Sequence, residues 1–103
     1  MALTSNQLSS GNTQIFSATG DQAITTIIFC NTDLVSTALI NVYAVGNGNV
    51  VSTGTQILKN LTLPPTETFV LDSEKFILGN GDALYAQSNI NNVVCATVSS
   101  VSI

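Results

Sequence analysis

The chain has 103 residues, of which 45% are hydrophobic and only 8% are charged, and its formal net charge is −4. One domain of this length can hold a hydrophobic core, and the apolar fraction is too high for a disordered chain. Two basic residues, Lys59 and Lys75, are too few for the basic surface that nucleic-acid binding requires. The composition therefore predicts a folded protein without a nucleic-acid partner.

Residues 1–12 are mostly short and polar, and they include Gly11. We expect them to form an extended arm, either flexible or docked on a neighbouring subunit, which precedes one domain at residues 13–103. The arm lacks the basic start and apolar stretch of a signal peptide, and no segment approaches the ~20 apolar residues of a membrane-spanning helix. We therefore expect a protein that is made in the cytoplasm and has no membrane partner.

From residue 13 onward, runs rich in β-branched and aromatic residues alternate with turn signals every ~8–12 residues, which is typical of all-β domains. Apolar side chains occupy both alternating positions of residues 23–30, so we expect a central strand covered on both sides. Pro64 and Pro65 mark a connection, because proline cannot donate a ladder hydrogen bond. The expected strands cover residues 13–16, 23–30, 38–45, 56–63 (a return that begins at 50–51 and bends at Gly54), 66–72, 76–78, 83–87 and 93–103.

The last expected strand changes its hydrophobic phase. Its even positions Val94, Ala96 and Val98 are apolar, whereas Val101 and Ile103 occupy odd positions. The change predicts a β-bulge near residues 99–100, or a face that passes from the core to a partner. About eight strands and no helix predict an all-β fold, a single antiparallel β-sandwich that is jelly-roll-like.

Two cysteines, Cys30 and Cys95, lie in apolar runs of two expected strands. A disulfide would be possible if those strands were neighbours. In a cytosolic product, however, two thiols that act as small hydrophobic side chains are the favoured interpretation. A metal site needs more ligands than two cysteines, and the chain has no histidine. We expect no metal and no cofactor.

Few residues offer catalytic chemistry. Glu67, Asp72 and Glu74 lie close together in sequence, and paired carboxylates are the machinery of glycosidases. Glu67 and Asp72 are five positions apart, however, so on one regular strand they would face opposite sides. This favours a charged edge that discourages strand pairing. The sequence at 80–82 (NGD) resembles part of a Ca²⁺ loop, but one carboxylate favours a turn whose aspartate binds backbone. We therefore expect no enzymatic activity.

Tyr43 and Tyr85 are candidates for stacking on sugar rings, as in a carbohydrate-binding module. The chain has no tryptophan, and packing at a sheet surface or interface is favoured for both tyrosines. The sequence at 60–62 (NLT) matches a glycosylation sequon, which has no meaning without a secretory signal.

The low charge predicts a protein that packs against other proteins. The abundant Thr, Ser and Asn side chains are neutral, and neutral hydroxyl and amide groups are desolvated at lower cost than ions. A secreted bacterial surface domain with the same compositional bias is the alternative.

Three segments carry a resemblance to a known class of proteins: residues 25–33 (TTIIFCNTD), 57–68 (ILKNLTLPPTET) and 79–86 (GNGDALYA), the last of which runs into the 93–103 strand. Their order, over residues 23–103, resembles small β-sandwich virion structural proteins of tailed bacteriophages. The resemblance implies a non-enzymatic role and supplies no catalytic residue.

The resemblance implies a capsid decoration (cement) protein that binds and stabilises the shell of major capsid protein. We accordingly expect a virion location and a homo-oligomer, with a trimer favoured. The alternatives are a tail, neck or fibre-associated component that binds other virion proteins, and a carbohydrate- or host-surface-binding module. The candidate interface residues are Leu3, Leu8, Tyr43, Val101 and Ile103.

Overall fold

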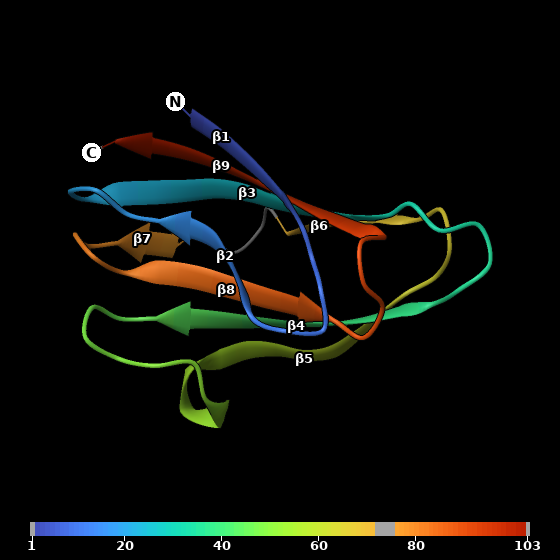
Figure 1. Ribbon diagram of the computed structural model, residues 1–103. Coiled ribbons are helices and arrows are strands. Elements are labelled where there is room, and N and C mark those ends of the chain that lie inside the picture. Colours follow the sequence, from blue (N-terminus) through green and yellow to red (C-terminus); the bar gives the residue numbers. More distant parts are fainter. Residues whose placement is uncertain (1, 72–75, 103) are drawn as a thin grey trace.

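The computed structural model describes residues 2–71 and 76–102, which form nine strands in two antiparallel sheets packed face to face (Figure 1). A single-turn 3-10 helix, η1 (Thr53–Thr55), precedes β5. Within the described residues, no helix has the length and apolar character needed to cross a membrane. The strands are β1 (Ala2–Gln7), β2 (Thr13–Ser17), β3 (Gln22–Asn31), β4 (Ala38–Val45), β5 (Gln56–Leu63), β6 (Thr68–Leu71), β7 (Phe76–Leu78), β8 (Ala83–Ser88) and β9 (Val94–Ser102).

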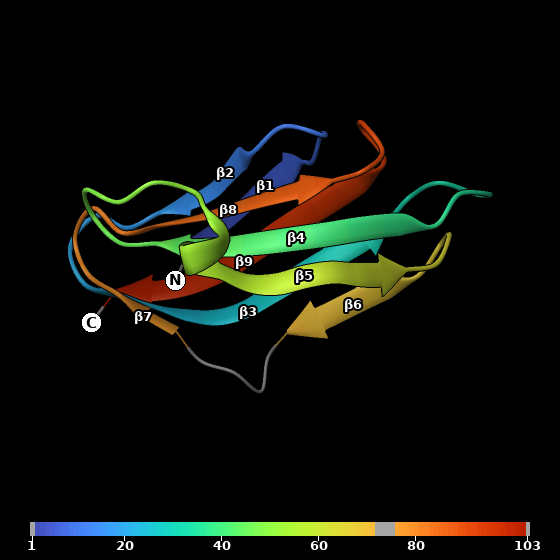
Figure 2. The same cartoon turned by 90° about the horizontal axis from the view of Figure 1, so that it is seen from below.

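The strand order is that of a jelly roll. One sheet has the order β1-β9-β3-β6, with β7 also paired to β3, and the other has the order β2-β8-β4-β5 (Figure 2). Antiparallel pairs join β1 with β9, β2 with β8, β3 with β6 and β7, and β4 with β5. The chain is thus one long hairpin folded over into two sheets. The predicted β-sandwich is confirmed, and β6 and β7 share the place of one strand.

The core lies between the two sheets and follows the two-residue period of the strands. In β9, the even positions from Val94 to Ser100 are buried, while the odd positions between them are partly exposed. The fully buried side chains include Phe29 and Ile27 from β3, Ile40 and Val42 from β4, and Leu84 from β8.

The N-terminal segment is part of the sandwich. Residues 2–7 form β1, which pairs in continuous register with β9. Leu8 follows with its side chain fully buried, and its N–H donates a 2.8 Å hydrogen bond to the carbonyl oxygen of Val94. The arm expected at residues 1–12 is therefore corrected. Backbone pairing with the edge of β9 orders this polar segment, and Leu8 anchors it in the core.

A β-bulge lies where the apolar phase of the C-terminal strand changes, but it does not alter which positions of that strand face the core. Ile24 pairs with Ser100 and Thr26 pairs with Ser99, so Thr25 of β3 is the extra residue. The even positions of β9 remain inward as far as Ser100, and Val101 consequently lies on the outer face. The predicted irregularity near residues 99–100 is present, but its extra residue belongs to the partner strand.

Two other expectations are corrected. The return strand begins at Gln56 rather than at Val50, because residues 53–55 form η1, which Ser52 caps through a 3.2 Å hydrogen bond from the Gly54 N–H to its Oγ. The strand expected to be covered on both sides, β3, buries only its inner side chains fully. Its outward residues Ile28 and Cys30 are half-buried on the outer surface of the sheet.

Candidate functional site

The outer surface of the four-stranded sheet carries a row of amide and phenol side chains. Gln14 of β2, Tyr85 of β8, Tyr43 of β4 and Gln56 of β5 are successive cross-strand partners. We call this surface the amide–tyrosine face. It also includes Asn41 and Gln87, which pair with each other two residues away from Tyr43 and Tyr85 on β4 and β8. The two-residue strand period places five of these side chains on the side away from the core, and a register shift of β5 between Leu58 and Gln56 brings Gln56 to the same side.

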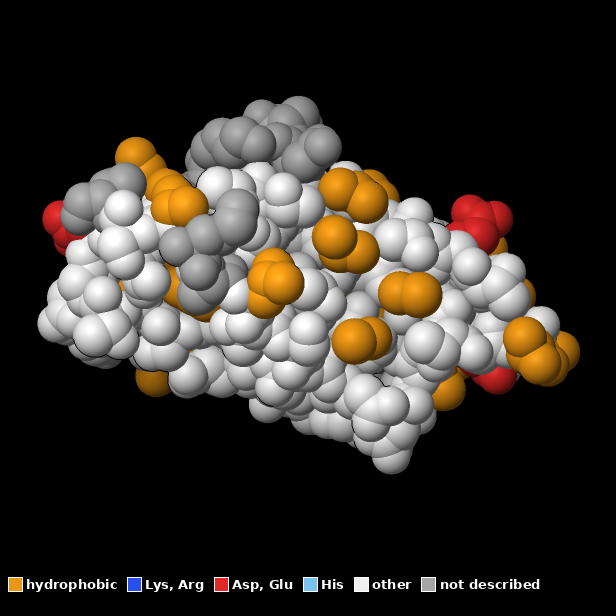
Figure 3. Space-filling model, turned by 90° about the horizontal axis from the view of Figure 1, so that it is seen from above, with side chains coloured by type: hydrophobic (Ala, Val, Ile, Leu, Met, Phe, Trp, Pro, Cys, Tyr) orange, Lys and Arg blue, Asp and Glu red, His pale blue; other side chains and the backbone are white. Residues whose placement is uncertain are grey.

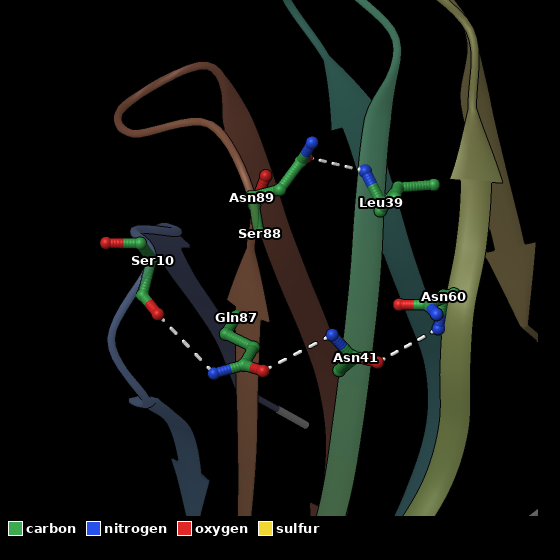
Figure 4. A pocket seen from close by; sticks show the side chains of 7 residues that line it. All are labelled: Ser10, Leu39, Asn41, Asn60, Gln87, Ser88 and Asn89. Atoms are coloured by element: carbon green, nitrogen blue, oxygen red, sulfur yellow. Dashed lines mark hydrogen bonds between the residues drawn. The ribbon is translucent and has the colours of Figure 1, made fainter.

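An open pocket of about 140 Å³ adjoins this row. Figure 4 shows that the loop after β1, the middle of β4, the edge strand β5 and the end of β8 surround it. None of the described residues that line it is charged. The lining residues are Ser10, Leu39, Asn41, Asn60, Gln87, Ser88 and Asn89.

Asn41 is the centre of the hydrogen-bond network beside the pocket. Its Nδ2 donates to Gln87 Oε1 at 3.2 Å, and its Oδ1 accepts from the Asn60 backbone N–H and from Gln56 Nε2, both at 2.9 Å (Figure 4 draws the bonds to Gln87 and Asn60). Asn60 has a positive φ of 52° next to a register shift of β5, a conformation that asparagine tolerates better than most residues. The irregular strand therefore aims a backbone donor at Asn41.

The two tyrosines lie directly opposite each other on β4 and β8. Tyr85 donates its hydroxyl proton to Gln14 Oε1 at 3.0 Å, and Tyr43 donates to Gln87 Oε1 at 3.4 Å. Both side chains are partly exposed. Their phenol groups thus join the amide network, while their rings form the apolar part of the same surface.

This arrangement favours binding rather than acid–base chemistry. The pocket offers amides, hydroxyls and backbone groups, which donate and accept hydrogen bonds without carrying charge. Such groups can hydrogen-bond to a neutral polyhydroxyl compound, and the tyrosine rings offer an apolar surface beside them. No sequence pattern associated Asn41 or Tyr43 with Gln87 or Asn60, because these residues come from three different strands.

The outer surface of the five-stranded sheet is different in character, and we call it the neutral face. Figure 3 shows hydrophobic side chains spread over it, with acidic side chains at its two ends. Among its apolar residues, Leu3 and Ile77 are each 72% exposed and Val70 is 46% exposed. Register and burial assign to it Leu3, Ser5, Gln7, Ala23, Thr26, Ile28, Cys30, Thr68, Val70, Ile77, Cys95, Thr97, Ser99 and Val101, none of which is charged.

The structure separates the five candidate interface residues. Leu3 and Val101 lie on the neutral face, whereas Tyr43 lies on the amide–tyrosine face. The side chain of Leu8 is in the core, so it is not a contact residue in this fold. Ile103 lies outside the described residues. The candidates therefore define two opposite surfaces rather than one interface.

The acidic candidates do not assemble into a site among the described residues. Asp82 accepts backbone N–H bonds from Gly79 at 2.9 Å and from Asn47 at 2.8 Å, so the turn interpretation of this aspartate is confirmed. Glu67 lies in the turn before β6, whereas Asp72 and Glu74 fall outside the described residues. In the described part of the chain, no group of three or more His, Cys, Asp or Glu side chains is placed to bind a metal ion.

Comparisons with known proteins add no assignment to this geometry. No protein-family model, no curated protein and no solved structure matches the chain.

Proposed function

We propose that this chain is a non-enzymatic bacteriophage virion structural protein, a capsid decoration (cement) protein that docks on the shell of major capsid protein through its neutral face. The neutral face is the observation that carries the proposal. Among the residues that the structure describes, it presents exposed Leu3, Val70 and Ile77 among hydroxyl groups and no charged side chain. A sheet surface of neutral polar and exposed apolar side chains suits protein association, because such a surface is covered at low desolvation cost.

Fold and sequence resemblance both support this proposal. The jelly roll is shared by viral capsid domains and lectins, which is an analogy at the level of the fold. Two of the segments that resemble virion proteins also meet in space. The Asn31 N–H donates to the Glu67 carbonyl oxygen, and the Thr66 N–H donates to that of Asp33, both at 3.0 Å. The segments therefore build one end of the sandwich together.

The mechanism is stabilisation by mass action. A subunit that binds only the assembled shell lowers the free energy of that state, by an amount that grows with the concentration of the subunit relative to its Kd. The chain in this role is a homo-oligomer, with a trimer as the favoured state. Light scattering of the purified chain measures that state directly.

The test is to purify particles from cells that make the chain, quantify its copies by mass spectrometry and measure shell melting after removal and re-addition. Re-added wild-type chain is expected to raise the melting temperature, and Val70→Lys or Ile77→Lys is expected to abolish the effect. Leu34→Lys is the matched control, because Leu34 is 80% exposed and lies in a loop outside the neutral face. Unchanged shell melting with the wild-type chain contradicts the proposal, and a few copies per particle favours a tail, neck or fibre component.

A second candidate function, saccharide binding at a host surface, is favoured by the pairing of Tyr43 with Tyr85 beside the amide-lined pocket. A glycan array tests it with wild type, Tyr43→Ala, Tyr85→Ala and Gln87→Ala. Specific retention that all three variants lose supports this function. Val70→Ala, on the opposite surface, is the control, and equal loss in that variant or no retention by wild type contradicts it.

A further inference from the structure

The only two cysteines of the chain are direct cross-strand partners. Cys30 of β3 lies opposite Cys95 of β9, and both thiols are free and partly exposed on the neutral face. The sequence left open whether their strands are neighbours, and the topology makes them so.

The hydrogen-bond pattern defines the geometry of this pair. The Thr32 N–H donates to the Val93 carbonyl oxygen at 2.8 Å, two residues beyond the cysteines in the same register. The Asn31 N–H instead bonds the Glu67 carbonyl oxygen at 3.0 Å, on the opposite side of the strand. The even-numbered residues of this part of β3 therefore direct their backbone hydrogen bonds to β9. Cys30 and Cys95 accordingly occupy a hydrogen-bonded position of the ladder, where the two backbones and not the thiols are bonded.

This pair of positions is close enough for a disulfide, but a disulfide formed there would be strained. The Cα atoms of a hydrogen-bonded antiparallel pair lie about 5.5 Å apart, within the roughly 4.4–6.8 Å range that disulfides span. Cβ atoms of such pairs lie at the upper end of about 4.5–5.5 Å, whereas a disulfide requires about 3.8 Å. Closing the bond must draw β3 and β9 together, and strained disulfides are the readily reduced ones.

We infer that Cys30 and Cys95 form a reversible dithiol–disulfide site, whose co-reactant is a small-molecule disulfide of the glutathione class. One cysteine thiolate attacks a sulfur of that disulfide, forms a mixed disulfide and releases one thiolate. The second cysteine thiolate then attacks the cysteine sulfur of the mixed disulfide, closes the internal bond and releases the other thiolate. The two released thiolates take up the two thiol protons, so the small disulfide is reduced by the two electrons that the cysteine pair loses.

The test uses the purified, folded chain at low concentration with oxidised glutathione, followed by alkylation and intact mass measurement. Both thiols are expected to disappear together, with loss of two hydrogen atoms, no bound glutathione and no covalent dimer. Excess reduced glutathione is expected to restore both thiols. Retention of both thiols, a lasting glutathione adduct or a disulfide between chains overturns the inference.

Three variants act as controls, each checked for a cooperative thermal transition. Cys30→Ser and Cys95→Ser are each expected to retain one glutathione as a mixed disulfide; uptake by neither would mean that the thiols are inaccessible, and the inference would fail. The double variant Ile28→Cys, Cys30→Ser keeps two thiols on the same surface but places them diagonally, at about 7–8 Å. It is expected to form no internal disulfide, and closure there would show that strand register does not define the site.

Discussion

The side-chain amide of Asn31 donates a 3.0 Å hydrogen bond to the carbonyl oxygen of Leu63, and so joins the end of β3 to the end of β5 in the other sheet. Asn31 is fully buried. Its Nδ2 also donates to the Ser36 carbonyl oxygen at 2.9 Å, and its Oδ1 accepts from the Asp33 N–H at 3.0 Å. One side chain of β3 thus satisfies backbone groups of the other sheet and of the loop between the sheets.

Asn31→Ala is expected to lower the free energy of unfolding by about 2–3 kcal/mol, because buried backbone groups lose their partner. Chemical denaturation monitored by circular dichroism measures the change. Asn49→Ala is the control, since Asn49 is exposed and a surface substitution of this kind stays within about 0.5 kcal/mol. Equal effects of the two substitutions would contradict the linking role of Asn31.

Leu8→Ala tests whether the N-terminal segment belongs to the sandwich. Leu8 is completely buried, and removal of a buried leucine side chain is expected to cost about 3 kcal/mol in unfolding free energy. Leu3→Ala is the matched control, because Leu3 is 72% exposed on β1, and its effect is expected below about 0.5 kcal/mol. A negligible effect of Leu8→Ala would contradict this placement and would favour an N-terminal arm that is detached from the sandwich.

Gly81→Ala is expected to be more destabilising than Gly48→Ala. Both glycines have positive φ, 88° and 84°, but a Cβ at Gly81 would lie 2.6 Å from Asn47 Cγ, whereas a Cβ at Gly48 meets nothing within 4 Å. We expect about 1 kcal/mol for Gly48→Ala from backbone strain and about 3 kcal/mol for Gly81→Ala from strain plus overpacking.

A double-mutant cycle separates the two contributions at Gly81. In an Asn47→Ala background the obstructing side-chain atoms are absent, so the cost of Gly81→Ala is expected to fall to that of Gly48→Ala. Thermal or urea unfolding of the four proteins gives the coupling. An unchanged cost would mean that the contact with Asn47 is not the cause.

The Asp33 carboxyl group makes the free energy of unfolding depend on pH, and the direction of its pKa shift gives the sign of that dependence. The hydroxyl and backbone N–H of Ser36, followed by backbone N–H groups of Leu34 and Val35, lower the pKa of Asp33 below its ordinary value, against a smaller opposing effect of desolvation. Because the folded-state pKa lies below the unfolded-state pKa, the stabilisation is complete above the unfolded-state value. It is lost as the pH falls through the lowered folded-state pKa.

NMR titration of the Asp33 carboxyl group measures this pKa. Ser36→Ala removes the hydroxyl but keeps the backbone N–H, which lies 3.0 Å from the carboxylate, so the pKa is expected to rise part of the way toward the ordinary value. The acid-induced loss of stability still begins near the unfolded-state pKa, but it should be smaller and should be complete at a higher pH. An unchanged pKa in Ser36→Ala would contradict the assigned cause.

Local sequence signals correctly predicted the strands in which the alternation of apolar and polar residues and the flanking turn residues indicate the same bounds. The expected strands at 38–45 and 56–63 coincide with β4 and β5. β1 was missed because an edge strand needs no apolar alternation when its order comes from backbone bonds to β9. The pocket was missed for a related reason: Ser10, Asn41, Asn60 and Gln87 come from four separate segments, and no local pattern reports their proximity.

The amino-acid sequence alone determined that this protein is an all-β sandwich with very few charges. Composition is read directly from the sequence, and the two-residue alternation of apolar side chains is a local pattern that arises because each strand buries one face. Only the tertiary structure decided that Leu8 is a core residue, that Tyr43 faces Tyr85, and that Cys30 faces Cys95. Those relationships depend on which strands become neighbours when the long hairpin folds over. That choice is made by the packing of the whole core and not by any one segment.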